Sequence, residues 1–405
     1  MIEKQTIYKR LKTCEVLNIP QIKKLMLNDW NTLSKDARYY LTIPQMLVSG
    51  RDVRARVGTF NDPWGTSVSS KWTPTPFQFI NTSLSDIVNQ RAIEILNNAK
   101  NTNRSIVILW SGGIDSTVIL TAFLKNLSLA DHELLTVCLN TQSIADNPSF
   151  YFNFLSTNKK IKFLPATNFS FITDDFLSKN VLLHGDPGDG VYGPSTGMYR
   201  TFSNESKHLE LWKNNLKGIY KILEPNIEID QIVEPGFGPW FANIITRTLE
   251  ESGQADYIST VADWYWWTYF NFKWSSMCCY PLFNGILSPD HRGLSDENFD
   301  FYSKNIFYHS SQFQNWSYSN LKELVGIDIF KTHKLKAREY IYEFDKNFQY
   351  FSRKRKTSTA SPSLRHHKSS IIAHDQNFKP IFGGSPHAKQ AVSMILKRYK
   401  ESEEI

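Results

Sequence analysis

A short glycine turn between an apolar run and a helical segment is the feature that most constrains this chain. Residues 106–110 read Ile-Val-Ile-Leu-Trp, which is typical of a buried strand. The turn at 111–116 reads Ser-Gly-Gly-Ile-Asp-Ser, and residues 117–125 have the composition of a helix. The backbone N–H groups of a helix N-terminus that follows a tight glycine turn can bind an anion. The sequence therefore predicts an anion site at 111–117.

The side chains of this turn suit a phosphate that carries a metal ion. Hydroxyl groups add donors, and glycines let the backbone approach a ligand closely. The residues expected to contact phosphate are Ser111, Gly112, Gly113, Ser116 and Thr117. Asp115 would repel a phosphate by itself, but its presence makes sense if it holds a metal that bridges to the phosphates. The turn is not a Walker loop, because no lysine follows the glycines. A plain Gly-Gly turn with Asp115 as a helix-start acid is the alternative.

Residues 185–193 form a second glycine-rich segment, Gly-Asp-Pro-Gly-Asp-Gly-Val-Tyr-Gly, after an apolar run. Gly185 and Gly188 would let this backbone pass close to a bound phosphate. Asp186 and Asp189 place two carboxylates three residues apart. Together with the acid of the first turn, they make an oxygen-rich set of the kind that Mg²⁺ prefers.

Alternating apolar and helical segments predict an α/β fold, with a parallel sheet covered by helices on both faces. The four expected strands are 106–110, 134–139, 161–164 and 181–183. In such sheets ligands bind beyond the carboxyl ends of the strands. The first turn, the polar residues 140–143 and the segment from 184 each follow a strand end. We therefore expect these segments to form one site.

Three parts are predicted along the 405 residues. Residues 1–80 form an N-terminal region of unknown role, residues 81–360 a domain that holds both glycine-rich segments, and residues 361–405 a basic, polar tail that ends in a helix. The C-terminal half of the middle part is helical and rich in aromatic residues, most densely at 263–274. Aromatic residues at this density fill a core more often than they form a base-stacking surface.

Composition and charge limit the partners and the cellular location that we expect for this chain. No apolar run approaches 18 residues and the N-terminus lacks the pattern of a signal peptide, so we expect no membrane contact. The four cysteines include no Cys-x-x-Cys pair, which favours reduced thiols and a cytoplasmic protein. The net charge of the chain is +7. The positive charge is concentrated at 331–368, a segment that contains eleven basic and three acidic residues. This segment could attract ATP, pyrophosphate or nucleic acid.

The order of the two glycine-rich segments resembles the synthetase domain of asparagine synthetases, within the PP-loop superfamily of N-type ATP pyrophosphatases. The resemblance covers about residues 80–360. It implies an adenine nucleotide α-hydrolase-like fold and ATP with Mg²⁺ as cofactors. It also implies that Asp115 and Asp189 hold the metal. Asp186 would line the same cavity as a candidate catalytic residue.

The resemblance extends to cationic and adenine-binding positions. Residues 332–341 and 351–357 are similar to the end of that domain, where a late lysine contacts phosphate and the reacting centre. Lys356 is the best match and Arg353 its neighbour, although Lys354 and Arg355 compete in register. In the family the ends of two strands receive adenine through backbone groups. This implies a role for the strand ends near Leu109 and at Leu139 and Asn140.

Two features depart from that family. Asp189 is followed by Gly190, where the family has Asp-Glu, and this change would alter the acceptor side of the pocket. The chain begins Met-Ile rather than Met-Cys, and residues 1–80 are too few for a glutaminase domain. We therefore expect no ammonia generator in this chain, which leaves a separate amidotransferase as a candidate partner.

The expected activity is that of an AMP-forming carbon–nitrogen ligase. A carboxylate or carbonyl oxygen of a small-molecule substrate attacks the α-phosphate of ATP, and ammonia or an amine then displaces AMP. One alternative is a PP-loop enzyme that modifies a base of transfer RNA, which the basic segment favours but the lack of paired cysteines opposes. Another is a nucleotide-binding protein without catalytic activity.

Overall fold

The computed structural model describes about two thirds of the chain, in two compact units. The described residues are 8–11, 14–17, 29–46, 55–58, 60, 63, 72–166, 169, 171–193, 207–216, 219, 235–286, 294–324, 332–353, 373–374, 380–381, 397 and 399–400. The sheet unit comprises 80–188, 281–316 and 334–405, and the aromatic unit comprises 1–79, 189–280 and 317–333. A unit boundary falls next to residue 80. The predicted middle part, 81–360, contributes to both units.

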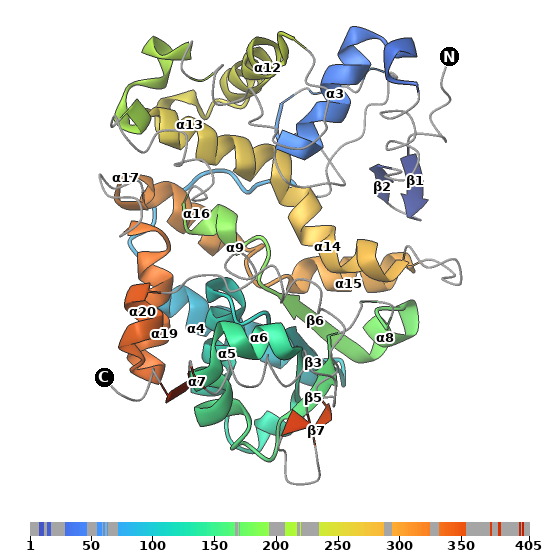
Figure 1. Cartoon of the computed structure of the whole chain (residues 1–405), viewed down its shortest axis with the longest axis vertical. Coiled ribbons are helices and arrows are strands. Elements are labelled where there is room, and N and C mark those ends of the chain that lie inside the picture. Colours follow the sequence, from blue (N-terminus) through green and yellow to red (C-terminus); the bar gives the residue numbers. More distant parts are fainter. Residues whose placement is uncertain are drawn as a thin grey trace. The chain divides into compact units, whose positions relative to one another are not determined.

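A four-stranded parallel sheet is the centre of the sheet unit (Figure 1). Its order is β5–β4–β3–β6, and its strands are β3 (Ser105–Leu109), β4 (Leu135–Leu139), β5 (Lys162–Pro165) and β6 (Asn180–His184). The mixed α/β fold with a parallel sheet is therefore confirmed. Leu109 pairs with Cys138 of β4 on one side and with His184 of β6 on the other. The carboxyl ends of these three strands thus lie at one edge.

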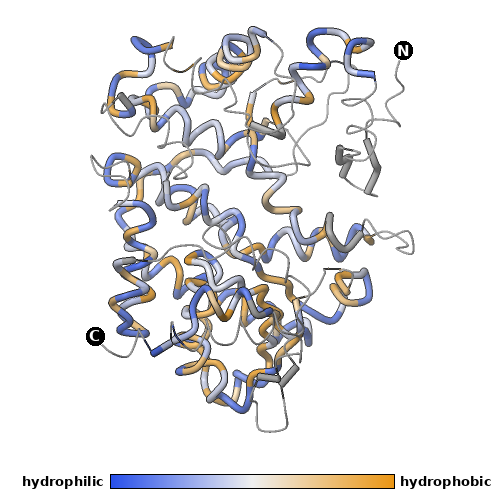
Figure 2. Tube along the Cα trace, in the orientation of Figure 1, coloured by the Kyte–Doolittle hydropathy of each residue, from blue (hydrophilic) through white to orange (hydrophobic). Residues whose placement is uncertain are grey.

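Burial explains why these runs form strands. Ile106, Val107 and Ile108 of β3 are at most 1% exposed, and every residue of β4 is buried. Apolar runs without alternation suit a parallel sheet that is covered on both faces. In Figure 2 the central strands are coloured as hydrophobic, whereas the helices alternate between hydrophobic and hydrophilic residues. Each fully buried Ile or Val side chain contributes about 1.5–3 kcal/mol to stability.

Helices connect and cover the strands of the sheet unit. In α4 (Leu84–Asn101) the side chain of Ser83 caps the first turn by accepting from the amide of Asp86. Helix α5 (Ile114–Asn126) packs against α4 and α19 (Leu335–Asp345). The remaining helices of this unit include α6 (Thr141–Asp146), α7 (Pro148–Phe150), α8 (Asp174–Lys179), α15 (Asp296–Asn305) and α20 (Phe348–Arg353).

The C-terminal residues of the sheet unit are described only in part. Strands β7 (Ala373–His374) and β8 (Pro380–Ile381) pair antiparallel. The Tyr399 hydroxyl donates to the Asn153 side chain at 2.9 Å, and its ring contacts Phe152. Most of the helix predicted near the C-terminus lies outside the described residues.

The aromatic unit owes its core to the densest aromatic segment of the sequence. Its elements are β1 (Tyr8–Leu11), β2 (Cys14–Leu17), α3 (Lys35–Met46), α12 (Phe237–Glu251), α13 (Val261–Thr268), the π-helical turn Tyr269–Lys273, the start of α14 (Trp274–Ile286), the end of α16 (Ser311–Ser319) and α17 (Leu321–Leu324). Trp264, Trp266, Trp267 and Trp274 are each less than 2% exposed. The interpretation of 263–274 as core is therefore confirmed.

Arg56 is buried within this aromatic core. Its guanidinium lies 4.4 Å from the ring centroids of both Phe270 and Trp274, and its Nε donates to the carbonyl of Trp72 at 2.6 Å. Desolvation by burial lowers the pKa of Arg56 to about 9. Cation–π contacts and carbonyl acceptors together compensate for the lost hydration of this charge.

The structure describes the side chains of three cysteines, and its helices can be compared with the length needed to span a membrane. Cys138, Cys278 and Cys279 are buried, and none of the three forms a disulfide. Burial raises the pKa of the Cys138 thiol to about 12, which keeps it protonated at neutral pH. In the part of the chain that the structure covers, no helix has the length and apolar character needed to cross a membrane.

Candidate functional site

The first glycine turn joins β3 to α5 at the carboxyl edge of the sheet. Gly112 has a φ of +71°, and a Cβ there would collide with the carbonyl oxygen of Ser143. Only glycine is free of strain in this position. The first intrahelical bond runs from the Thr117 amide to the Gly113 carbonyl at 3.0 Å. The amides of 114–116 precede it, so the positive end of the helix dipole faces the turn.

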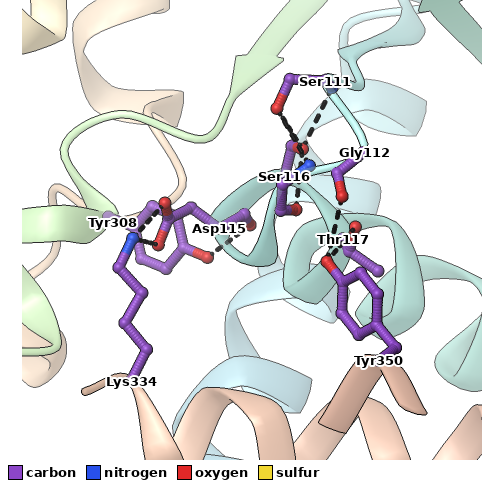
Figure 3. A network of polar contacts seen from close by, with 9 residues as sticks. Ser111, Gly112, Asp115, Ser116, Thr117, Tyr308, Lys334 and Tyr350 are labelled. Carbon is purple, nitrogen blue, oxygen red and sulfur yellow. Dashed lines mark hydrogen bonds and ion pairs between the residues drawn. The ribbon is translucent and has the colours of Figure 1, made fainter. Parts of the chain in front are cut away.

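Hydroxyl groups hold the turn in shape (Figure 3). The hydroxyls of Ser111 and Ser116 lie 3.1 Å apart. The Ser111 amide donates to Ser116 Oγ at 3.1 Å, and the Gly113 amide donates to Ser111 Oγ at 3.2 Å. Ser111 is exposed, whereas Ser116 and Thr117 are buried, and Thr117 accepts from Trp110 Nε1 at 3.0 Å. Ser111 therefore marks the face of the turn that is open to a ligand, and Ser116 supports it from beneath.

Asp115 forms an ion pair with a lysine that the sequence reasoning missed. Lys334 Nζ lies 2.7 Å from Oδ1 and 2.5 Å from Oδ2 of Asp115. The side chain of Lys334 is only 6% exposed, and that of Asp115 is 19% exposed. Lys334 precedes α19 with a φ of +52°, which is uncommon for a residue with a side chain. It belongs to the basic segment 331–368, in which the family resemblance implies a role for the later cations at 353–356.

Two buried tyrosines hold backbone carbonyls of the same turn. The Tyr308 hydroxyl donates to the Asp115 carbonyl at 2.7 Å, and the Tyr350 hydroxyl donates to the Gly112 carbonyl at 3.0 Å (Figure 3). Burial raises the pKa of Tyr350 well above its usual value, so the phenol remains a donor. No sequence signal distinguishes these tyrosines in a chain that has 18 of them.

The second glycine-rich segment meets the first at Asp115. A Cβ on Gly185 would lie 3.0 Å from the Ser116 amide nitrogen, and one on Gly188 would lie 2.9 Å from Asp115 Oδ1. The Gly188 amide closes the segment by donating to the Gly185 carbonyl at 2.9 Å. The expected convergence of these two segments is therefore confirmed, and the close approach explains both glycines.

The acidic residues of the second segment belong to different units. Asp186 lies in the sheet unit, whereas Asp189 is the first residue of the 189–280 segment of the aromatic unit and the second residue of α9 (Gly188–Val191). Among the described residues, no group of three or more His, Cys, Asp or Glu side chains could hold a metal ion. Mg²⁺ commonly binds through one or two carboxylates together with waters and substrate phosphates. The metal roles of Asp115 and Asp189 stay predictions.

Gly190 packs directly against the aromatic core. A Cβ at this position would lie 2.9 Å from Cζ3 of Trp274. The Gly190 carbonyl also accepts from Trp266 Nε1 at 2.8 Å. The aromatic core of this unit thus takes the space that a side chain at 190 would need.

The third predicted segment lies after β4. Asn140 caps α6 by accepting from the Ser143 amide at 2.9 Å, and its side-chain nitrogen donates to the Ala166 carbonyl at 3.3 Å. The Leu139 carbonyl accepts from the Ala166 amide at 2.8 Å. These groups are engaged in local structure, and their predicted role toward adenine is untested.

The predicted catalytic cations lie at the limit of the described residues. Arg353 ends α20, while Lys354, Arg355 and Lys356 lie outside the described residues. Their roles, like that of Asp186, remain predictions from the family resemblance. Lys334 is therefore the cation that the described part of the chain brings to the turn.

Comparison with known proteins supplies no relative. No model of a protein family matches the sequence, and no curated protein is significantly similar to it. The geometry alone indicates what the site can do. A helix N-terminus, two serine hydroxyls and a buried ammonium group can bind an anion, and the Asp115 carboxylate already binds a cation.

Proposed function

We propose that the chain binds ATP with Mg²⁺ at the 111–117 turn and cleaves it to AMP and pyrophosphate while forming a carbon–nitrogen bond. The observation that carries this proposal is the packing of both glycine-rich segments against Asp115, at the N-terminus of α5. Phosphate needs close backbone approach and N–H donors, and a carboxylate at such a site needs a cation. Asp115 meets the second requirement through Lys334.

The chain's own residues have distinct roles in this proposal. The amides of the first turn of α5 and the hydroxyls of Ser111 and Ser116 bind the β- and γ-phosphates. Asp115 would hold Mg²⁺, which when bound neutralises charge on the phosphates. Lys334, the present partner of Asp115, is near enough to offer its ammonium group to the leaving pyrophosphate.

The bond changes follow from these roles. A carboxylate oxygen of the substrate forms a bond to the α-phosphorus, and the bond from that phosphorus to the bridging oxygen of pyrophosphate breaks. A nitrogen nucleophile then attacks the activated acyl carbon, and AMP leaves with the acyl oxygen. Preorganised N–H donors and a buried ammonium stabilise the negative charge on the leaving group.

Substrate-dependent ATP–pyrophosphate exchange tests the proposal. A panel of amino acids and other carboxylates, with ammonia or amines, should contain a substrate that drives exchange and AMP release. Asp115→Ala should abolish both. Asp175→Asn is the matched control, because Asp175 pairs with Lys179 on the exposed surface of the same unit.

Other outcomes would redirect the proposal. AMP release that needs a transfer RNA fraction would indicate the RNA-modifying alternative. Nucleotide binding without AMP formation under any condition would indicate a binding protein without catalytic activity. Full turnover by Asp115→Ala would contradict the metal role of this carboxylate.

A further inference from the structure

Tyr350 reaches the first glycine turn from the opposite side to the serine hydroxyls. It lies in α20 and is 6% exposed. Its hydroxyl is 3.0 Å from the Gly112 carbonyl oxygen and 3.4 Å from Thr117 Oγ1. Figure 3 shows the ring on one side of Gly112 and Ser111 on the other. The phenol therefore contacts the turn from within the protein core.

The geometry of the peptide unit gives this contact a consequence. The carbonyl of Gly112 and the N–H of Gly113 belong to one trans peptide plane, so they point in opposite directions. A hydrogen bond from Tyr350 to that carbonyl turns the Gly113 N–H toward the serine side. There it donates to Ser111 Oγ at 3.2 Å. One phenol thus fixes the direction of an amide on the ligand-facing side.

Glycine makes such a constraint necessary. Gly112 and Gly113 have no side chains to restrict their backbones, so the peptide plane between them could rotate at little cost. A rotated plane would present a carbonyl oxygen to an incoming phosphate, which would repel it. The hydrogen bond from the Gly113 N–H to Ser111 Oγ restrains this plane on one side, and the bond from Tyr350 to the Gly112 carbonyl restrains it on the other.

We propose that Tyr350 is a positioning residue, which orients the Gly112–Gly113 peptide so that its N–H binds phosphate. This inference rests on the proposed function. The same hydrogen bond attaches α20 to the turn. Because α20 ends at Arg353, the chain that leads to the predicted cations starts from a helix fixed to the phosphate site.

A second buried tyrosine separates this role from ordinary core packing. Tyr340 lies in α19 of the same unit and is 3% exposed. Its hydroxyl donates to Asn89 Oδ1 at 2.6 Å, away from the turn. Tyr340→Phe and Tyr350→Phe each remove one buried, hydrogen-bonded phenol hydroxyl, but only the second change touches the turn.

The experiment measures binding of magnesium pyrophosphate to the full chain by calorimetry, and kcat and KM for ATP in the exchange assay. Tyr350→Phe should weaken pyrophosphate binding about tenfold and raise the KM for ATP similarly, as expected from misdirecting one hydrogen bond to a charged ligand. Tyr340→Phe should leave both values at wild type. Both variants should lose similar stability. Equal pyrophosphate affinity in the two variants would overturn the positioning role.

A measurement on the wild-type chain keeps the inference open to refutation if Tyr350→Phe does not fold. The Gly113 amide should gain protection from hydrogen exchange when magnesium pyrophosphate binds, and absence of this gain would contradict the inference. A wild-type chain that neither binds pyrophosphate nor supports exchange would overturn the proposed function, and this inference with it. Binding by wild type with no effect of Tyr350→Phe would overturn only the inference.

Discussion

Replacing Asp115 by asparagine should destabilise the sheet unit because it removes the carboxylate from a buried ammonium. The two charges are 2.5–2.7 Å apart, and Lys334 is only 6% exposed. Breaking a buried pair by removing one partner costs about 3–5 kcal/mol. Some solvent reaches Asp115, which is 19% exposed, so we expect the lower end, about 3 kcal/mol.

The double variant Asp115→Asn with Lys334→Met supplies the decisive comparison. Because it removes both charges, it should recover about 2 kcal/mol of the loss caused by Asp115→Asn alone. Urea unfolding measures these free energies, and a thermal melt should show about 2–4 °C for each kcal/mol. If the free-energy losses of the single variants Asp115→Asn and Lys334→Met simply add in the double variant, the claim that this pair is buried and coupled is refuted.

Activity separates the structural role of Asp115 from its proposed metal role. The double variant should be well folded and yet form no AMP, because it lacks both the carboxylate proposed to hold Mg²⁺ and the ammonium proposed to stabilise the leaving pyrophosphate. Asp175→Asn should change stability by less than about 0.5 kcal/mol, since its exposed pair is screened by water. AMP formation by the folded double variant would refute the metal role without affecting the ion-pair argument.

Three further changes test other parts of the structure. Burial raises the pKa of Asp345 to about 6, so its native state favours the protonated form. The stability that this shift contributes is fully present below about pH 4 and is lost as the pH rises through 6. Asp345→Asn should therefore raise the free energy of unfolding by up to about 3 kcal/mol at neutral pH. Unfolding measured across this pH range should then show a flatter pH dependence for the variant than for wild type. Gly112→Ala should cost at least about 2 kcal/mol and abolish pyrophosphate binding by calorimetry, because its φ is positive and its Cβ collides with Ser143. Gly190→Glu should cost about 1–3 kcal/mol in urea unfolding, and an added Trp274→Ala should relieve part of that clash.

The backbone of the candidate site was predictable because its signals are local. Apolar runs without alternation predict a parallel sheet, and parallel strands bring their following segments to one edge. The glycines at 112, 185 and 188 are explained by close approaches that no other residue would allow without strain or displacement. Short-range pattern and strand order were sufficient for this part.

The side chains around that backbone were not predictable in the same way. Lys334 contacts Asp115 across 219 residues of sequence, and Tyr350 contacts Gly112 across 238. Such contacts depend on how α19 and α20 pack against α5, and the periodicity of a helix does not specify its partner. The family resemblance implies a role for Arg353 and Lys356, whereas the cation that contacts the turn among the described residues is Lys334.

The position of Lys334 suggests why this cation precedes a helix rather than lying within one. A residue with positive φ breaks the helical path, so its side chain leaves the chain in a direction that no regular position of α19 offers. Such a backbone conformation costs about 1–2 kcal/mol for a residue with a side chain. An ion pair whose disruption costs more than this can maintain it. The ion pair with Asp115 therefore offsets the backbone strain, and a glycine at 334 would relieve that strain while losing the ammonium group.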